Sequence, residues 1–440
     1  MKAKSIIRTV LAILVLAIIG GCVYLDSLLP IITGYAAKNM ASDVFVSGRT
    51  PEDVKSLDLN FSFIKFTRDK VDFENRSVTS RFLWRKATAV YRDGYGVTLL
   101  RGKDKEAILN QEYPLIPETE APSPMDPGDP DLVSRLEPIA KALVDDHSYN
   151  GTPFAFVVLH KGTLVAERYR SGITSSTKLL SWSMAKSFTN ALAGVMSGDR
   201  LIDIYAPMNI PEWRNDGRED ITLNDLMQMQ SGLKWNEDYG NRSDVNLMLH
   251  REVDMGLYAL NKPLEHEPGT YWYYSSGSTN LVMRYLRGKF ASDKEFLTYI
   301  RERLFSPIGI RNAVFEPDMS GTPVGSSYLY VTARDFARFG QLYLEDGVAD
   351  GNRILPDGWV SYTVTPASGS EDSYGAFFWL NKNKYRPDAP EDMFYCQGHD
   401  GQAIFIIPSR ELVVVVLGYS PKPDHTIDFN SLLKDIIAEL

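Results

Sequence analysis

Ser183-Met-Ala-Lys-Ser-Phe-Thr-Asn-Ala-Leu-Ala-Gly-Val-Met196 is the run of residues from which the architecture of this chain can be worked out. Its apolar residues recur at helical spacing and predict an amphipathic helix. Ser183 and Lys186 are three residues apart, so their side chains share one face of that helix. A hydroxyl needs a basic neighbour of this kind before it can attack a carbonyl carbon. The run therefore predicts a nucleophilic serine at a helix N-terminus, where the helix dipole favours an alkoxide.

The Ser-x-x-Lys spacing is not specific by itself, because it occurs five times in the chain. The five pairs are Ser62–Lys65, Ser175–Lys178, Ser183–Lys186, Ser231–Lys234 and Ser431–Lys434. Ser62 lies in an alternating, strand-like stretch, where residues three apart point to opposite faces. Ser175 and Ser231 lie in polar or turn-like segments, and nothing follows Ser431 to complete a site. Ser183 alone starts a long amphipathic run, although a plain helix cap would use the same residue.

A second element lies about ninety residues further along the chain. Pro268 to Ser276 is a turn that runs into an aromatic stretch, in which Tyr274 is followed by small polar residues. A tyrosine held near a lysine can have its pKa lowered and can then act as general base and acid. Aromatic residues packed at a strand edge would produce the same pattern.

A third element, Gly398-His399-Asp400-Gly401-Gln402, directly precedes a predicted strand at 403–407. Glycines at the start of a strand allow a substrate to approach the backbone closely and leave N–H groups for an oxyanion. His399 taken alone could equally be a turn histidine.

The order of predicted elements indicates an α/β (α+β) fold. It consists of a helix at 132–143, a strand–turn–strand unit at 154–169, the helix after Ser183, a helical and turn-rich middle at 200–300, two strands at 403–407 and 412–417, and a last helix at 429–440. This order implies an antiparallel β-sheet flanked by helices, plus a mainly helical subdomain.

The N-terminal third differs in pattern. We predict a small β-rich region over residues 26–113, with a hairpin turn at Asp93-Gly94; residues 31–60 carry no clear pattern. A proline-rich, acidic stretch at 114–130 indicates a linker. The remaining residues, 131–440, form the predicted catalytic domain.

Residues 1–25 carry an apolar stretch, Val10–Val23, after three basic residues, Lys2, Lys4 and Arg8. This stretch has about the length of the apolar part of an export signal and is short for a full membrane span. Ile19-Gly-Gly-Cys22 resembles a bacterial lipobox, which makes Cys22 a lipidation candidate. The alternatives are an uncleaved membrane anchor and a buried helix. Lipidation of Cys22 or an uncleaved anchor would each place the protein in the cell envelope, periplasmic or extracytoplasmic, as a lipoprotein or anchored by its N-terminus.

Composition narrows the function further. Apolar residues make up 44% of the chain, the net charge is −9, and no basic run is present, which argues against nucleic acid as a partner. The two cysteines and six histidines show no metal-binding spacing, so we expect neither a metal nor another cofactor.

The order Ser-x-x-Lys, Tyr-Ser-x, His-x-Gly resembles the serine β-lactamase and penicillin-binding-protein superfamily. It is most similar to the branch related to class C β-lactamases, which includes esterases and 6-aminohexanoate-dimer hydrolases. Three more segments match that branch, namely Ile221–Leu233, Thr332–Gly340 and Gly398–Leu417. The resemblance covers roughly residues 131–440 and implies a β-lactamase/transpeptidase-like fold.

By position, the resemblance implies that Ser183 is the acylated nucleophile and that Lys186 deprotonates it or polarises Tyr274. Tyr274 would move the proton to the leaving group and then activate the deacylating water. The backbone N–H groups of Ser183 and Gln402 would form the oxyanion hole.

Two departures from the family pattern favour an ester or amide over a β-lactam as substrate. Ser276 stands where the third residue of Tyr-x-Asn carries an amide, and His399 replaces a lysine that would attract a β-lactam carboxylate. Both residues, together with Gly401, are predicted substrate contacts. Tyr239, in Trp235-Asn-Glu-Asp-Tyr-Gly, resembles a tyrosine that contacts the scissile amide in the dimer hydrolases, although a packed loop tyrosine is as consistent with the sequence.

The sequence therefore leads to an exported or membrane-tethered serine hydrolase that acts on small amides or esters. A penicillin-recognising peptidase or β-lactamase, and a non-catalytic envelope binding module on the same fold, are the alternatives. No Gly-x-Ser-x-Gly elbow is present to support a Ser-His-Asp hydrolase.

Overall fold

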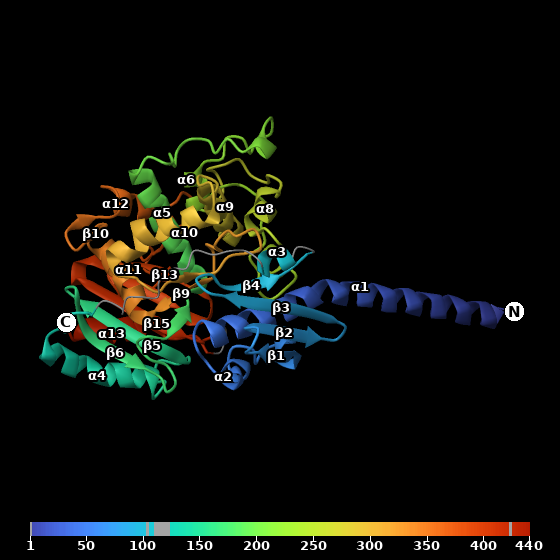
Figure 1. Cartoon of the computed structure of the whole chain (residues 1–440), viewed down its shortest axis with the longest axis horizontal. Coiled ribbons are helices and arrows are strands. Elements are labelled where there is room, and N and C mark those ends of the chain that lie inside the picture. Colours follow the sequence, from blue (N-terminus) through green and yellow to red (C-terminus); the bar gives the residue numbers. More distant parts are fainter. Residues whose placement is uncertain (1, 103–104, 110–123, 422–424) are drawn as a thin grey trace.

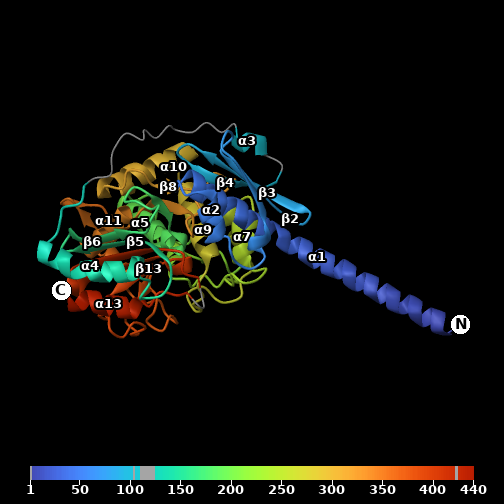
Figure 2. The same cartoon turned by 90° about the horizontal axis from the view of Figure 1, so that it is seen from below.

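The computed structural model describes residues 2–102, 105–109, 124–421 and 425–440 (Figure 1). Most of the predicted proline-rich linker, residues 114–123, lies outside the described residues. A long N-terminal helix projects from a folded body that holds the rest of the described chain (Figures 1 and 2).

The body is built on a six-stranded antiparallel sheet in the order β12-β13-β14-β15-β5-β6. Its strands are β12 (Trp379–Leu380), β13 (Phe394–Gln397), β14 (Ala403–Ile407), β15 (Leu412–Gly418), β5 (Pro153–His160) and β6 (Thr163–Tyr169). Every residue of β14 and β15 is buried, because both faces of the sheet are covered. The strand predictions at 154–169, 403–407 and 412–417 are confirmed.

The two faces of this sheet enter separate hydrophobic clusters. Ile404, Ile406 and Val413 pack on the face covered by α11 (Ala333–Leu344). Phe405 and Val414 point the other way. That second face is covered by α4 (Pro130–Val144) and α13 (Phe429–Ala438). The prediction of an antiparallel sheet flanked by helices, including the first and last helices, is confirmed.

The mainly helical part lies between β7 (Lys178–Leu180) and β9 (Leu329–Thr332) in the sequence. It contains α5 (Ala185–Gly198), α6 (Leu223–Met227), α7 (Asp244–Arg251), α8 (Met255–Leu260), α9 (Ser276–Arg287) and α10 (Asp293–Ile300). A small sheet joins β7 (Lys178–Leu180), β9 (Leu329–Thr332) and β8 (Val314–Phe315). The predicted helix after Ser183 begins two residues later than expected, because Trp182–Met184 form a 3₁₀ turn ahead of α5.

The N-terminal region contains a four-stranded antiparallel sheet of β1 (Arg68–Asp72), β2 (Ser77–Phe82), β3 (Arg85–Arg92) and β4 (Gly96–Leu100). Gly94 lies in the tight turn between β3 and β4 with φ of 77°, as the hairpin prediction requires. Ser62 was expected in a strand, and this expectation is wrong. Its φ of 44° places it in a turn before the 3₁₀ segment Ile64–Phe66.

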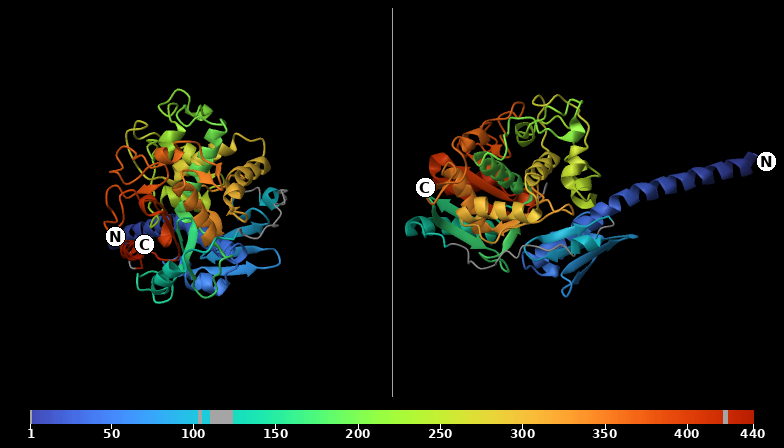
Figure 3. Two further views of the ribbon diagram at one scale, coloured as in Figure 1. Left: turned by 90° about the vertical axis from the view of Figure 1, so that its left-hand side faces the viewer. Right: turned by 45° about the horizontal axis from the view of Figure 1, so that its top comes forward.

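The helix α1 (Lys2–Phe45) has two halves in different surroundings. Residues 6–23 are exposed, and within the described residues this is the one helix apolar and long enough to cross a membrane. Leu29 and residues 32–44 are buried, with Ala36 and Ala41 fully covered, and this half packs against the four-stranded sheet and the rest of the body (Figure 3). The unassigned stretch after residue 30 thus begins with helix, and the region 26–113 mixes helix with strands.

Candidate active site

Ser183 and Lys186 meet at the start of α5. The Lys186 Nζ lies 2.9 Å from the Ser183 Oγ, 3.0 Å from the Ser276 Oγ and 3.1 Å from the Ser326 carbonyl oxygen. The lysine is 1% exposed. Burial lowers the pKa of Lys186 to about 8, an effect that the Glu237 carboxylate opposes. A buried amine with a lowered pKa, in contact with a hydroxyl, is equipped to remove its proton.

The turn that presents Ser183 is strained and tightly held. Trp182 has a φ of 44°, a left-handed conformation that costs energy for a bulky residue. The preceding residue, Ser181, is fully buried; its N–H donates to the Leu329 carbonyl at 2.8 Å and its hydroxyl to the Ser327 carbonyl at 3.2 Å. These bonds fix the turn to β9 and so set the position of the Ser183 hydroxyl.

Tyr274 is the third member of the cluster. The Lys186 Nζ lies 4.9 Å from the centre of its ring. Burial raises the pKa of Tyr274 well above its ordinary value, the Glu237 carboxylate adds to the rise, and a hydrogen bond with Ser183 opposes it. The expectation that the lysine lowers this pKa is not met, because burial outweighs the neighbouring charge. Tyr274 is therefore a protonated phenol at neutral pH.

Glu237 is a site residue that the sequence reasoning missed. Its carboxylate accepts a hydrogen bond from the Ser276 hydroxyl, a second from the Ser276 N–H at 2.9 Å, and a third from the Trp235 indole at 2.5 Å. The Tyr239 hydroxyl lies 3.4 Å away. The sequence signal for Glu237 is its place in Trp235-Asn-Glu-Asp-Tyr239, two residues before the tyrosine that is a predicted substrate contact.

Ser276 lies in a different place from the one its prediction implies. It is fully buried under Lys186 and bridges that amine to Glu237. It therefore holds the lysine and does not line the open cleft. The missing amide of the family's Tyr-x-Asn is replaced by a serine–carboxylate pair.

The connection between β13 and β14 packs against the turn that carries Ser183. A Cβ added to Gly398 would lie 2.4 Å from the Ser181 carbonyl oxygen, so only glycine fits there. Gly401 has a φ of 89°, which again favours glycine. The Gly398 N–H donates to the Gln402 carbonyl at 2.9 Å, and the Gln402 side chain bonds the Gly418 backbone. The structure thus brings the strand start at Gln402 beside the Ser183 turn.

A cleft of about 950 Å³ opens over these residues. The predicted site residues on its wall are Ser183, Tyr274, Tyr239, His399 and Gly401. The Tyr239 ring stacks on the His399 ring at 4.8 Å, and the latter meets Trp182 edge-on at 5.4 Å. Trp379, Tyr385 and Tyr395 line the rest of the wall together with polar residues, so the cleft suits a small molecule with apolar parts.

Comparison with known proteins agrees with this geometry. The family model described as Beta-lactamase matches residues 137–434, more than half of the chain. A 6-aminohexanoate-dimer hydrolase from Paenarthrobacter ureafaciens is 26% identical over 360 residues, which cover 73% of this chain and 87% of that protein.

Solved structures agree as well. A Bacillus anthracis protein provisionally named a 6-aminohexanoate-dimer hydrolase has a TM-score of 0.56 and 28% identity, covering 68% of this chain and 80% of that one. A penicillin-binding protein homologue from Caulobacter crescentus has a TM-score of 0.57 at 15% identity, covering 73% of this chain and all of that one, and it shows the shared fold alone. The chain belongs to the Beta-lactamase family and is a serine hydrolase of the amidase- and esterase-like kind.

Proposed function

We propose that this protein is an exported or membrane-tethered hydrolase that cleaves small amides or esters through an acyl-enzyme on Ser183, with Lys186 and Tyr274 as general base and acid. The observation that carries the proposal is the 2.9 Å contact between the Ser183 hydroxyl and a buried lysine of lowered pKa. The related dimer hydrolase, whose name denotes a substrate made of two linked 6-aminohexanoate units, supports an amide.

The chemistry follows from the contacts. Neutral Lys186 accepts the Ser183 proton while the oxygen attacks the substrate carbonyl, and the backbone N–H groups of Ser183 and Gln402 stabilise the oxyanion. The bond to the leaving group then breaks as Tyr274 donates its proton, and Lys186 returns a proton to Tyr274. Water attacks the acyl-enzyme by the reverse sequence, which releases the acid and restores the Ser183 hydroxyl.

Tyr239 and His399 are the substrate contacts that the cleft supports best. Their stacked rings line the same wall of the cleft as Ser183. Gly401, on the same wall, leaves room for a substrate backbone. An apolar acyl chain would pack on Trp379 and Tyr395.

The exposed half of α1 supports attachment to a membrane, either as an uncleaved anchor or through a lipid on Cys22. Cys22 is exposed on that half of the helix. Because α1 continues as one helix from its exposed half into buried residues, the anchor is joined directly to the body.

A penicillin-recognising peptidase or β-lactamase is a second candidate, favoured by the family model itself. Two sequence departures count against it: His399 replaces a lysine that would attract a β-lactam carboxylate, and Ser276 lacks the amide of the family's Tyr-x-Asn. A purely binding module would have no need to keep Ser183, Lys186 and Tyr274 in mutual contact.

One experiment separates these functions. Purified full-length protein is offered p-nitrophenyl esters of short acids, short linear amides of ω-amino acids, and nitrocefin, and is labelled with a fluorophosphonate probe. Turnover of esters or amides with slow nitrocefin hydrolysis is expected. Fast nitrocefin hydrolysis, or a stable β-lactam adduct, would favour the second candidate. A folded protein that neither labels nor turns over any of them would contradict both.

The pH dependence of the reaction tests the role of Lys186. Its neutral form is the base, so with a pKa of about 8 it is active in about one-tenth of molecules at pH 7 and about nine-tenths at pH 9. We therefore expect kcat/KM to rise through pH 8 and to level off above it. A profile that is flat across this range would show that Lys186 is not the base.

Glu237→Gln tests whether this carboxylate holds Ser276 in place and raises the pKa of Lys186. The variant keeps an acceptor for Ser276 but removes the negative charge that raises the pKa of Lys186. We expect the rising limb of the kcat/KM profile to move to lower pH. The plateau should fall about tenfold, because a neutral acceptor holds Ser276 more weakly.

The neighbouring carboxylate provides the matched control. Asp238→Asn changes a residue bonded to Gly240 and Asn241 of its own loop, so both the midpoint and the plateau should stay unchanged. An unshifted midpoint in Glu237→Gln would refute the electrostatic role.

A further inference from the structure

One end of the N-terminal four-stranded sheet exposes large apolar side chains. Phe63, Phe66, Leu83 and Trp84 are 57%, 59%, 58% and 56% exposed. Side chains of this size are normally covered, and several together mark an interaction site. We call these four residues the anchor-side edge, because they lie at the end of the sheet that is nearest the projecting half of α1.

The strand register places these residues together. Arg68, where β1 starts, pairs with Arg81 near the end of β2, and Phe82 pairs with Arg85 at the start of β3. The turn between β2 and β3 therefore lies at the same end as the start of β1. The ring centres of Phe63 and Phe82 lie 6.3 Å apart, which brings the segment before β1 to the same end.

This end of the sheet touches α1 where the helix leaves the body. The Trp84 indole donates to the Asp26 carboxylate at 2.7 Å, and the Arg85 Nε donates to the same oxygen at 2.8 Å. Figures 1 and 2 show the tip of the β2–β3 hairpin beside α1, pointing toward the projecting half of the helix. Tyr24, two residues before the contact, is 61% exposed.

The length of the exposed helix matches a bilayer. Residues 6–24 form a helical segment of about 28 Å, close to the roughly 30 Å hydrocarbon core. If this segment spans the core, Asp26 and Trp84 lie at the level of the lipid headgroups. Tryptophan and tyrosine are the side chains enriched at that level.

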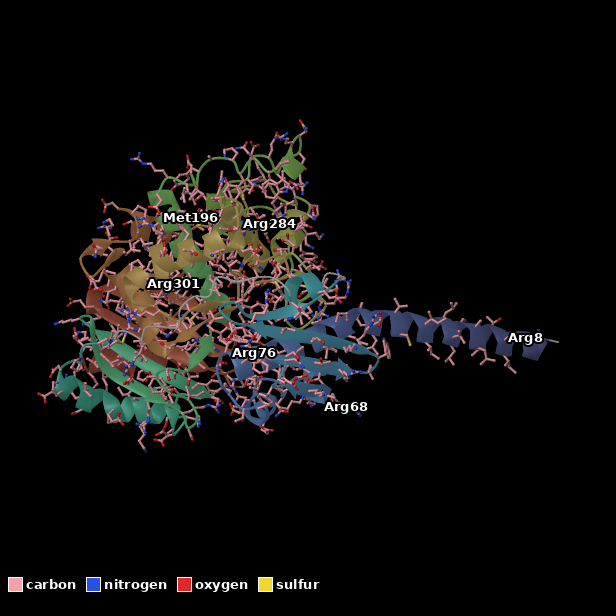
Figure 4. All side chains as sticks on the ribbon, in the orientation of Figure 1. Arg8, Arg68, Arg76, Met196, Arg284 and Arg301 are labelled. Carbon is pink, nitrogen blue, oxygen red and sulfur yellow. The ribbon has the colours of Figure 1, made fainter. Side chains whose placement is uncertain are left out.

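The charge of the sheet changes from one end to the other. Five exposed basic residues lie at or near the anchor-side edge, namely Lys65, Arg68, Arg81, Arg85 and Lys86. The turns at the opposite end carry Glu74, Arg76 and Asp93, and Arg76 forms a salt bridge with Asp93. Figure 4 shows Arg68 toward the projecting half of α1 and Arg76 toward the body. Basic and aromatic residues at one level fit the headgroups of anionic lipids.

We propose that the anchor-side edge rests on the headgroup layer of an anionic lipid bilayer that α1 spans. This inference depends on the membrane attachment proposed above. Because the inner half of α1 is buried in the body, the contact holds the catalytic cleft in one orientation relative to the membrane surface.

The test uses the full chain in lipid vesicles. In a Cys22→Ser background, Leu83→Cys is labelled with the polarity-sensitive dye NBD; Cys396 is buried and stays unlabelled. The matched control is Phe73→Cys, which is 65% exposed in the turn at the opposite end of the sheet. Vesicles contain phosphatidylcholine with or without phosphatidylglycerol, and a lipid carrying a headgroup nitroxide serves as quencher.

We expect blue-shifted emission and nitroxide quenching at position 83, stronger with phosphatidylglycerol, and neither effect at position 73. Arg81→Gln/Lys86→Gln should reduce the gain from phosphatidylglycerol. Flotation of the vesicles first reports whether the protein inserts, so failure to float contradicts the anchoring itself. Protein that floats while position 83 behaves like position 73 would overturn the proposed contact, and quenching equal in both vesicles would overturn its anionic preference.

Discussion

Ser183→Ala is expected to abolish turnover and fluorophosphonate labelling, with a loss in kcat of at least about 10³-fold. The substitution removes the oxygen that forms the acyl bond and leaves the rest of the site in place. Lys186 keeps its contacts with Ser276 and the Ser326 carbonyl, so the protein should still fold. The loss is measured as kcat on the best substrate from the panel, and the labelled residue is identified by mass spectrometry.

Ser175→Ala is the matched control, since Ser175 has the same spacing to a lysine but lies in a polar turn near the surface. This variant should keep full turnover and labelling. Retained turnover in Ser183→Ala would refute the proposed nucleophile. Equal losses in both variants would point to damage to the fold.

Lys38→Met is expected to destabilise the folded protein by about 3–5 kcal/mol. Lys38 on α1 forms a salt bridge with Glu316, which follows β8, and the two side chains are 2% and 0% exposed. Glu316 also accepts hydrogen bonds from Ser42 and from the Val97 N–H. Without the lysine, its buried carboxylate has no opposite charge in this contact. The loss is measured by urea unfolding of the full chain in detergent micelles.

The pH dependence of this loss has a defined sign. Burial already raises the pKa of Glu316, and removal of Lys38 raises it further. A carboxyl group with a raised pKa in the folded state destabilises that state above its unfolded pKa, and the penalty disappears as protons bind. The deficit of Lys38→Met relative to the natural chain should therefore shrink as the pH falls.

An exposed pair provides the control. Arg76 and Asp93 form a salt bridge with side chains 45% and 61% exposed, so Arg76→Met should cost less than about 1 kcal/mol. Comparable losses in Arg76→Met and Lys38→Met would show that burial of the Lys38 pair contributes nothing. Replacement of both buried partners by apolar residues should recover part of the stability.

The buried pair also shows how the N-terminal region supports the site. The Lys38 Nζ lies 4.0 Å from the centre of the Tyr328 ring, and Tyr35 on the same helix stacks near Trp182 at 6.2 Å between ring centres. Trp182 directly precedes the nucleophile. The inner half of α1 is thus packed behind the turn that carries Ser183, and the region outside the family resemblance forms part of the wall of the catalytic body.

The elements that could be predicted from the sequence are those in which the pattern of apolar residues by itself indicates which side chains are buried. The continuous apolar runs of β14 and β15 can only lie in a covered sheet, and the spaced apolar residues of α4 indicate its buried face. The inner half of α1 could not be assigned because it carries Lys38 and Asp43, which are typical of a surface. Lys38 is buried against Glu316, which is far away in the sequence, and Asp43 pairs with Arg49 just after the helix.

The same distinction between local pattern and distant partners applies to the active site. The sequence by itself determined the proximity of Ser183 and Lys186, because a 3₁₀ turn that runs into a helix, like the helix itself, brings residues three apart together. The roles proposed for Tyr274 and His399 come from a resemblance to known proteins.

Tertiary structure alone decided the electrostatics. The pKa of Lys186 depends on its burial by other segments of the chain. Glu237 is linked to that lysine by hydrogen bonds through Ser276, which lies about forty residues after Glu237 in the sequence. Folding brings the half-buried Glu237 close to the buried Lys186, where charges act more strongly on one another than in water, and no local pattern in the sequence records that arrangement.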